Sequence, residues 1–247
     1  MQFCLEIENF HKIVVNGDIA FVSDLELVKM YKCKIIFSNA TAVLGDYMPF
    51  FSNFTGDKMS SVRKIELKHG KGNSSLTVVP FGATILSWIV DGHEKIFCSK
   101  KAVMDGTKAI RGGIPICFPA FGPWTYGPQH GFARNSKDWK VHHEPKVNVN
   151  TGDVELVLEL KDTEETRKVW DKKFTLTYKI TLKEKTLDLK VNVKNDGEDE
   201  FDMTFCFHTY FTTSNLPSVG ISDLKGIKFS STCSISYVFL PTNLQGS

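Results

Sequence analysis

The chain has 247 residues, of which 42% are hydrophobic and 23% are charged, a balance typical of a folded globular protein. Thirty basic and 28 acidic residues leave a net charge of +2, which is too small to indicate a nucleic-acid partner or an anionic membrane surface. No window approaches the roughly 20 apolar residues that a membrane span requires. We therefore expect no nucleic-acid partner and no membrane partner.

The six cysteines are scattered, without a CxxC pair or the spacing of zinc ligands. The sequence also lacks a recognisable signal peptide. Because disulfides persist mainly in oxidising compartments, these features predict reduced thiols in a cytoplasmic protein.

Residues 1–60 differ from the rest of the chain because no hydrophobic alternation is sustained there. The run Leu25–Phe37 fits either a short helix or a strand, and its period does not decide between them. We interpret residues 1–60 as an N-terminal extension of uncertain order.

From Val62 onwards the sequence predicts a succession of strands. Ile65, Leu67 and His69 alternate with charged residues, and two β-rich runs flank Pro80–Gly82. Asp91–Gly92 is a dipeptide typical of a tight hairpin turn.

Three later runs have an apolar residue at every second position, opposed mainly by Thr, Lys, Asp, Glu or Asn: residues 153–160, 174–182 and 186–194. Such a period is typical of antiparallel strands with one face on a core and one in water. Between the first two runs, Asp162–Asp171 predicts a short helix that is opened by a capping pattern at Asp162 and Glu165. Because βαβ alternation and repeats are lacking, the sequence predicts an all-β sandwich of large antiparallel sheets.

The segment Ile110–Asn135, IRGGIPICFPAFGPWTYGPQHGFARN, combines five glycines and four prolines without a lasting helical or strand period. Glycine permits backbone angles that other residues avoid and proline fixes φ, so the segment is restricted without being regular. This suits a loop that holds polar groups towards a small ligand. Arg111 and Arg134 bracket it, and Gln129 and His130 lie near its far end. A long ordered surface loop is the alternative interpretation.

The run from Glu200 to Phe211, EFDMTFCFHTYF, predicts a strand with two distinct faces. A period of two places an apolar set on one face: Phe201, Met203, Phe205 and Phe207. Cys206, His208 and Tyr210 then project from the opposite face. A single histidine is more often a structural residue, but one that lies opposite an aromatic face and beside a tyrosine is a candidate for chemistry.

The motifs RGGIPICFPAFGP, PQHGFARN and FCFHTYF resemble the glucose-6-phosphate 1-epimerase (hexose-6-phosphate mutarotase) family, a branch of the aldose 1-epimerase-like proteins. The similarity covers roughly Val62 to Lys228, and KAIRGG, ARNSKDWK and GIKF fit it too. The resemblance implies an antiparallel β-supersandwich of the galactose mutarotase kind, with a sugar site on its concave face. We divide the chain into residues 1–60, a partial epimerase-like domain over 61–229, and a divergent tail over 230–247.

The reaction of this family interconverts the α and β anomers of a hexose 6-phosphate. A base removes the proton of the anomeric hydroxyl, and an acid protonates the ring oxygen as the C1–O5 bond breaks. The resemblance makes His208 the catalytic general acid and Arg111, Gln129 and Arg134 substrate-binding residues, with His130 also facing the sugar. It implies a small sugar phosphate as the partner and no metal or organic cofactor. We expect a monomer, although no feature of the sequence fixes the oligomeric state.

The chain departs from the family pattern after the histidine strand. The family has a general-base glutamate well downstream, with a substrate-binding aspartate between, whereas the last acidic residue here is Asp223. Glu66, Glu94 and Glu155 have strand or turn contexts typical of solvated faces. We therefore expect the base to be missing and the fold to be incomplete at its C-terminal end, as in a truncated product. A mutarotase, a non-catalytic or vestigial sugar-phosphate-binding protein, and a lectin-like module remain alternatives.

Overall fold

A computed structural model describes residues 62–212, together with the backbone of five short strands outside this range. These five strands are β1 (Ile13–Val15), β2 (Asp18–Glu26), β3 (Cys33–Ile35), β4 (Ala40–Ala42) and β16 (Phe229–Ser231). Among the described residues, none of the helices has the length and apolar character needed to cross a bilayer.

The first sheet is an antiparallel meander of four strands: β5 (Ile65–Lys68), β6 (Ser74–Val79), β7 (Thr84–Val90) and β8 (His93–Glu94). The 3₁₀ turn Phe81–Ala83 separates β6 from β7 where the sequence has Pro80–Gly82. Asp91 and Gly92 both have positive φ, 50° and 79°, which is the conformation of a type I′ hairpin turn. The predicted hairpin between β7 and β8 is confirmed.

The second sheet has six strands in the order β1-β2-β13-β12-β11-β10. Its long strands are β10 (Lys140–Val147), β11 (Val154–Lys161), β12 (Phe174–Leu182) and β13 (Leu187–Asn195). The three predicted strands correspond to β11, β12 and β13 within one residue, and every second side chain is buried as expected. Val157 of β11 is buried as well, so both faces of that strand are covered at this position. β2 adds to β13 in the parallel direction.

The hydrophobic alternation does not predict β10, KVHHEPKV. Its side chains are mostly exposed, and its pairing with β11 is irregular at two places. Pro145 lies within it, and proline is tolerated in an edge strand because the outer N–H groups of that strand have no ladder partner. An edge strand of this kind has no buried face, so it leaves no apolar period in the sequence.

The helix α1 (Glu164–Val169) is two residues shorter at each end than the predicted range, and its N-cap lies one residue later than predicted. Thr163 is the N-cap, and it forms a reciprocal capping box with Thr166 instead of the predicted pair of Asp162 and Glu165. The Asp162 carboxylate is used elsewhere: it accepts the N–H of Phe174 at 3.0 Å and pairs with Arg167. The predicted cap is wrong because a long-range hydrogen bond to the start of β12 engages this carboxylate.

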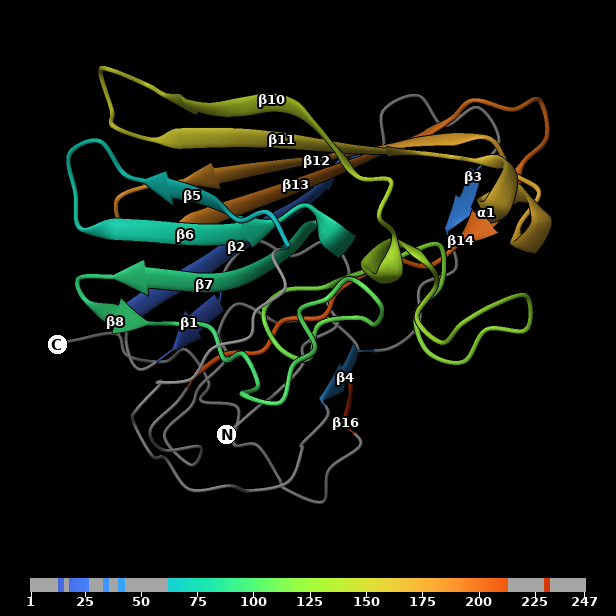
Figure 1. Ribbon diagram of the computed structural model, residues 1–247, viewed down its shortest axis with the longest axis horizontal. Coiled ribbons are helices and arrows are strands. Elements are labelled where there is room, and N and C mark those ends of the chain that lie inside the picture. The colour runs from blue at the N-terminus through green and yellow to red at the C-terminus, as the bar shows by residue number, and fades with distance from the viewer. Residues whose placement is uncertain are drawn as a thin grey trace, which may run out of the picture.

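The two sheets pack face to face around one large hydrophobic core. Apolar side chains of β5, β6 and β7 contact those of β11, β12 and β13, including Trp88, Leu156 and Tyr178, which are 0% exposed. Figure 1 shows the sheet of β5–β8 in front of the sheet that contains β10–β13. The all-β sandwich is therefore confirmed, and its inner faces are the alternating apolar residues of the sequence.

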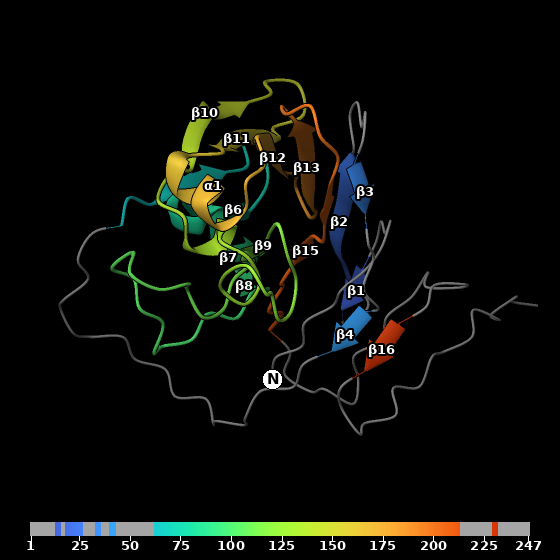
Figure 2. The same ribbon diagram turned by 90° about the vertical axis from the view of Figure 1, so that its right-hand side faces the viewer.

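Short pairs of strands complete the described structure. They are β9 (Ile116–Cys117) with β15 (Cys206–Phe207), β14 (Phe201–Met203) with β3, and β16 with β4. A view turned by 90° shows β9 and β15 side by side, next to β7 (Figure 2). The pairing of β9 with β15 brings the glycine- and proline-rich segment against the histidine run.

We expect Gly113→Ala to destabilise the fold by about 2 kcal/mol or more. Gly113 has a φ of 74°, and an added Cβ would lie 2.1 Å from the carbonyl oxygen of Ile85 on β7. Gly92→Ala is a matched control because Gly92 has a φ of 79° with nothing within 4 Å of the added Cβ. Chemical denaturation of both variants separates the cost of the close approach from the cost of positive φ, and equal destabilisation would contradict the close approach.

Candidate functional site

The histidine run is not the continuous strand predicted over Glu200–Phe211. β14 ends at Met203 and β15 begins at Cys206. Thr204 fills the break: its N–H donates to the Pro119 carbonyl at 2.9 Å, and its Oγ1 accepts the N–H of Phe121 at 2.6 Å. The prediction of one regular strand is wrong because Thr204 forms hydrogen bonds with the central segment, and these interrupt the strand between β14 and β15.

The break also changes which side chains reach the core. Phe201, Met203 and Phe211 are buried in the main cluster, whereas Phe205 and Phe207 are only partly buried against it. Cys206 and His208, on the alternate positions, are 4% and 7% exposed. The predicted separation into an apolar face and an opposite face therefore holds only in part, because both faces of this run are covered.

After the break, the histidine run lies antiparallel to the first half of the central segment. β15 pairs with β9, and the N–H groups of His208 and Tyr210 donate to the carbonyls of Pro115 and Gly113 at 2.9 and 3.0 Å. The two sequence motifs, far apart in the chain, are thus in direct backbone contact.

The central segment is not simply a surface loop. Residues 112–120 are buried, and residues 121–130 form the more exposed part that returns to them. The return is closed where the N–H of Phe132 donates to the Phe118 carbonyl at 3.0 Å. Gly131 permits this closure, since its φ is 70° and an added Cβ would lie 2.1 Å from the Phe118 oxygen. The segment is consequently a rigid, largely internal element.

His130 is fixed by its own backbone and ring. It has a φ of 66°, its N–H donates to the Gly122 carbonyl at 2.9 Å, and its Nδ1 accepts the N–H of Gly122 at 3.0 Å. Its ring also contacts Phe121, with centroids 4.9 Å apart. Because Nδ1 is an acceptor here, a neutral His130 carries its proton on Nε2.

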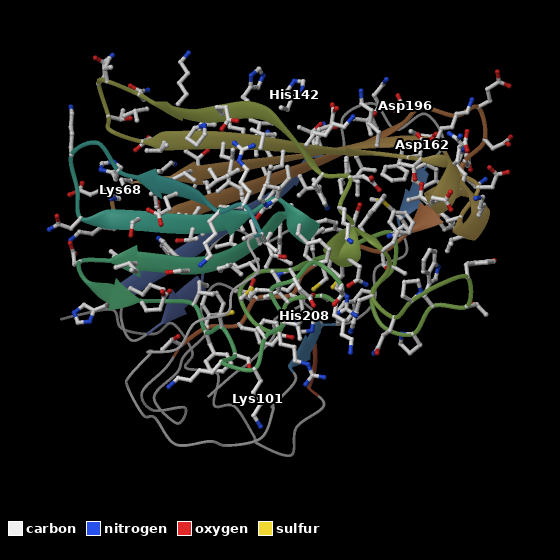
Figure 3. The ribbon with its side chains drawn as sticks, in the orientation of Figure 1. Lys68, Lys101, His142, Asp162, Asp196 and His208 are labelled. Carbon is white, nitrogen blue, oxygen red and sulfur yellow. The ribbon has the colours of Figure 1, made fainter. Side chains whose placement is uncertain are left out.

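The His208 ring lies between polar and aromatic neighbours. It stacks on Tyr210 with centroids 4.8 Å apart, meets the edge of His130 at 5.4 Å, and lies 6.2 Å from Phe121. In Figure 3, His208 lies among the loops below the sheets, on the other side of the molecule from His142 of β10. Two histidines from the two motifs are therefore brought together.

Two cysteines lie beside these histidines. Cys117 of β9 and Cys206 of β15 are register partners, and both are buried. A hydrogen bond from the Cys206 thiol, assisted by His130 and by the charge of His208, holds the pKa of Cys117 well below its usual range even though burial opposes this. Sequence reasoning missed Cys117, and its one signal was that Cys206 shares a face with His208.

Gln129 and Arg134 meet at the end of the segment. The Arg134 guanidinium donates from Nη2 to the Gln129 carbonyl at 2.8 Å, and Arg134 lies in the 3₁₀ turn Ala133–Asn135. Arg111 lies at the other end, where its carbonyl accepts the N–H of Ser99 at 2.9 Å. Its exposed side chain makes no hydrogen bond or ion pair within the part of the chain that the structure describes, so no such contact joins it to the other four site residues.

The carboxylates considered at the sequence level lie elsewhere. Glu66 is exposed on β5, and Glu155 of β11 pairs with Lys179. Glu94 is exposed at the end of β7–β8, where its Oε1 accepts the N–H groups of Trp88 and Ile96 at 2.9 and 3.0 Å. Over the described residues, no group of three or more His, Cys, Asp or Glu side chains is arranged to hold a metal ion.

The family model described as aldose 1-epimerase matches residues 63–238. The chain belongs to the aldose 1-epimerase family. Membership confirms the resemblance recognised in the glycine-rich and histidine motifs, and it agrees with the β-sandwich described above.

Curated members of this family are similar to the chain over about half of their own length. A Cenchrus ciliaris protein named as a glucose-6-phosphate 1-epimerase is 35% identical over 176 residues, which are 69% of this chain and 53% of that protein. An Escherichia coli protein of the same name is 34% identical over 172 residues, which are 68% of this chain and 54% of that protein.

Solved structures that are similar to the chain agree with the fold. A Salmonella typhimurium protein described as a mutarotase is 33% identical, with a TM-score of 0.52, over 58% of this chain and 47% of that protein. The Slr1438 protein of Synechocystis is 24% identical, with a TM-score of 0.56, over 66% of this chain and 58% of its own. The second likeness supports the fold alone.

Proposed function

We propose that the protein binds a hexose 6-phosphate at the central segment and acts on its anomeric centre as a mutarotase. The observation that carries the proposal is the contact of His130 with His208 at 5.4 Å, which joins the two motifs of an aldose 1-epimerase family member. The names of the plant and bacterial relatives support glucose 6-phosphate as the sugar.

His208 is the proposed general acid at the ring oxygen. A histidine has an ordinary pKa near 6.5, so it can give up and regain a proton near neutral pH. Its backbone is fixed by the hydrogen bond to Pro115 and its ring by the stacking on Tyr210, which limits the imidazole to one position. His130 lies against His208 and its Nε2–H is directed to Cys117, so it is proposed to face the sugar beside His208 without a donor of its own for a hydroxyl.

Arg111, Gln129 and Arg134 are the proposed substrate-binding residues. A guanidinium offers two parallel N–H groups to a phosphate or to neighbouring hydroxyls. The Arg111 side chain is exposed and makes no ion pair with any described residue, so it is available to an anionic ligand. The bond between Arg134 and the Gln129 carbonyl keeps these two residues at the same end of the segment.

The general base has no proposed residue in this chain. The resemblance assigns it to a glutamate well beyond the histidine strand, and the sequence contains no carboxylate side chain after Asp223. Glu94, the nearest candidate in sequence to the segment, holds two backbone N–H groups. We therefore propose that this polypeptide binds the sugar phosphate and exchanges its anomers only slowly, and the alternative is a non-catalytic or vestigial protein that binds without exchanging them.

The proposal also covers the domain boundaries, the cellular location and the oligomeric state. We propose an epimerase-like domain over residues 61–229, with residues 1–60 and 230–247 as flanking segments, in a cytoplasmic monomer. The family match beginning at residue 63 supports the start of that domain.

Arg111→Ala tests the ligand class. We expect it to weaken binding of glucose 6-phosphate by about 10- to 100-fold, because hydrogen bonds to a charged group contribute roughly 1.5–3 kcal/mol. Binding of glucose, which lacks the phosphate, changes less than twofold. Isothermal titration calorimetry with both sugars measures the difference.

Arg63→Ala is the matched control, since Arg63 is also exposed and its guanidinium pairs with Glu144 on β10. It should leave both affinities unchanged. An Arg111 variant that loses glucose and glucose 6-phosphate affinity equally would show that Arg111 binds hydroxyls. A variant with unchanged affinity for both would support the lectin-like alternative over the phosphate site.

A further inference from the structure

Cys117 and Cys206 face each other across the short ladder of β9 and β15. The N–H groups of His208 and Tyr210 donate to Pro115 and Gly113, so these register pairs are of the hydrogen-bonded kind. Hydrogen-bonded pairs occur at every second position, which places the cysteine pair in the same class, with Cα atoms roughly 5.5 Å apart. Disulfides most often join Cα atoms at about this separation.

The two sulfur atoms also lie on the same side of the ladder. Residues directly opposite each other in an antiparallel pair project to the same face, and Cys117 and Cys206 are such partners. A hydrogen bond from the Cys206 side chain to the Cys117 sulfur agrees with this placement. Both residues are reduced thiols in the structure. A disulfide between them therefore needs the loss of two hydrogens and a small rotation of the side chains, with no rearrangement of the strands.

The surroundings favour a thiolate at Cys117. The hydrogen bond from Cys206, that from His130 and the charge of His208 lower the pKa of Cys117, and the thiolate is the form that reacts with oxidants. Cys98 provides a contrast in the same domain, because burial and the charge of Glu94 raise its pKa to about 11 although Lys64 opposes them. Cys98 thus stays a thiol at neutral pH.

We propose that Cys117 and Cys206 are a peroxide-oxidised thiol pair that closes into an intramolecular disulfide beside His208. The Cys117 thiolate attacks one oxygen of hydrogen peroxide, the O–O bond breaks, and a sulfenic acid and hydroxide form. The Cys206 sulfur then attacks the sulfenic sulfur, the S–O bond breaks, and the hydroxyl leaves as water with the Cys206 proton. The hydroxide takes up the proton that Cys117 lost when it ionised, so two thiols are oxidised and one peroxide is reduced to two waters.

The burial of the pair selects the oxidant. Cys117 is 0% exposed and Cys206 is 4% exposed, so a protein thiol or a large disulfide has no approach to the sulfur atoms. Hydrogen peroxide is little larger than water. The half-buried His130 and Tyr210, which contact His208, form the boundary with solvent that it has to cross.

Closure of this disulfide alters the proposed site directly. His208 follows Cys206 by two residues on the same strand face, and His130 contacts both Cys117 and His208. The cross-link replaces a thiolate beside two imidazoles with a neutral sulfur and ties β9 to β15. This consequence rests on the proposed function, whereas formation of the disulfide does not.

Peptide mapping of the full chain tests the proposal without an activity assay. The reduced protein is treated with hydrogen peroxide, alkylated under denaturing conditions and digested with trypsin. Peptides 112–134 and 195–225 contain one cysteine each, Cys117 and Cys206. We expect them as one linked species, lighter than their sum by two hydrogens, which dithiothreitol separates.

Variants and the other cysteines decide the outcome. Cys98→Ser should leave the linked species unchanged, whereas Cys117→Ser and Cys206→Ser should each abolish it. Circular dichroism checks that the variants fold. If they do not fold, the proposal is judged from the unsubstituted protein, by whether peroxide links its two cysteine peptides. Failure to link the two peptides, or linkage of either to other cysteine peptides in equal yield, would overturn the proposal, even for a protein that binds glucose 6-phosphate.

Discussion

The 247-residue chain is expected to exchange the anomers of glucose 6-phosphate about 10²–10⁴ times more slowly than the full-length Escherichia coli relative. Ring opening needs a base at the anomeric hydroxyl and an acid at the ring oxygen. The chain supplies the proposed acid, His208, but no carboxylate after Asp223 in the region where the resemblance places the base. Losing one of two proton-transfer groups typically costs a factor of this size.

Two-dimensional exchange NMR on equilibrated glucose 6-phosphate measures the rate, because the α and β anomeric protons give separate signals. The E. coli protein is a suitable reference, since it is 34% identical to the chain over the shared region. His208→Asn keeps a polar planar side chain but removes the titratable imidazole. We expect it to bring the remaining rate of this chain to that of the buffer.

Equal rates for this chain and the E. coli relative would contradict the proposal that the base is lacking. A rate that His208→Asn leaves unchanged would instead remove His208 from the role of acid. The calorimetric test of Arg111 is separate from both results, because binding does not require proton transfer. A slow chain that binds glucose 6-phosphate is the combination that the proposal expects.

The sequence predicts the strands that have one buried and one wet face. β11, β12 and β13 were located within one residue because every second side chain enters the core. β10 was missed since an exposed edge strand has no such period. The break at Thr204 was also missed, because it depends on a hydrogen bond from Thr204 to the Pro119 carbonyl and one from the Phe121 N–H to Thr204, which no local pattern encodes.

The candidate site, like the fold, is predicted only in part from the sequence. The glycines and prolines of the central segment indicate a restricted chain, and the structure brings its His130 against His208. Cys117 was not predicted, because its pairing with Cys206 depends on the register between β9 and β15. The roles of His208, Arg111, Gln129, His130 and Arg134 stay predictions until the sugar and rate measurements are made.

Tyr178 offers the largest expected change in stability. It lies in the middle of β12, opposite Leu158 of β11 and Val191 of β13, and it is 0% exposed. Its ring also contacts Phe207, with centroids 5.7 Å apart, so it links the main sheet to the histidine run. We expect Tyr178→Ala to lower the free energy of unfolding by about 3–5 kcal/mol, as for other large aromatic side chains removed from a core.

The aromatic ring of Tyr178 stabilises the fold, whereas its hydroxyl group is expected to destabilise it. It is buried and has no hydrogen-bond partner among the described residues, and an unsatisfied buried polar group costs roughly 1–3 kcal/mol. Tyr178→Phe should therefore leave the stability unchanged or raise it by about 1 kcal/mol. Tyr126→Phe is the matched control, because Tyr126 is 70% exposed and removal of its hydroxyl should change nothing.

The same hydroxyl predicts a loss of stability at high pH. Burial raises the pKa of Tyr178 well above its ordinary value near 10, so the folded protein keeps the proton that the unfolded chain releases. Below pH 10 both states keep this proton, so the stabilising effect of the raised pKa is fully present. Above pH 10 the free energy of unfolding falls by about 1.4 kcal/mol for each pH unit, until the folded group also ionises. Urea denaturation at pH 8 and pH 11 should show this loss in the unsubstituted protein and a smaller loss in Tyr178→Phe. If Tyr178→Phe is instead destabilised at pH 8 by more than about 1 kcal/mol, the hydroxyl makes a stabilising hydrogen bond, and the expected gain is wrong.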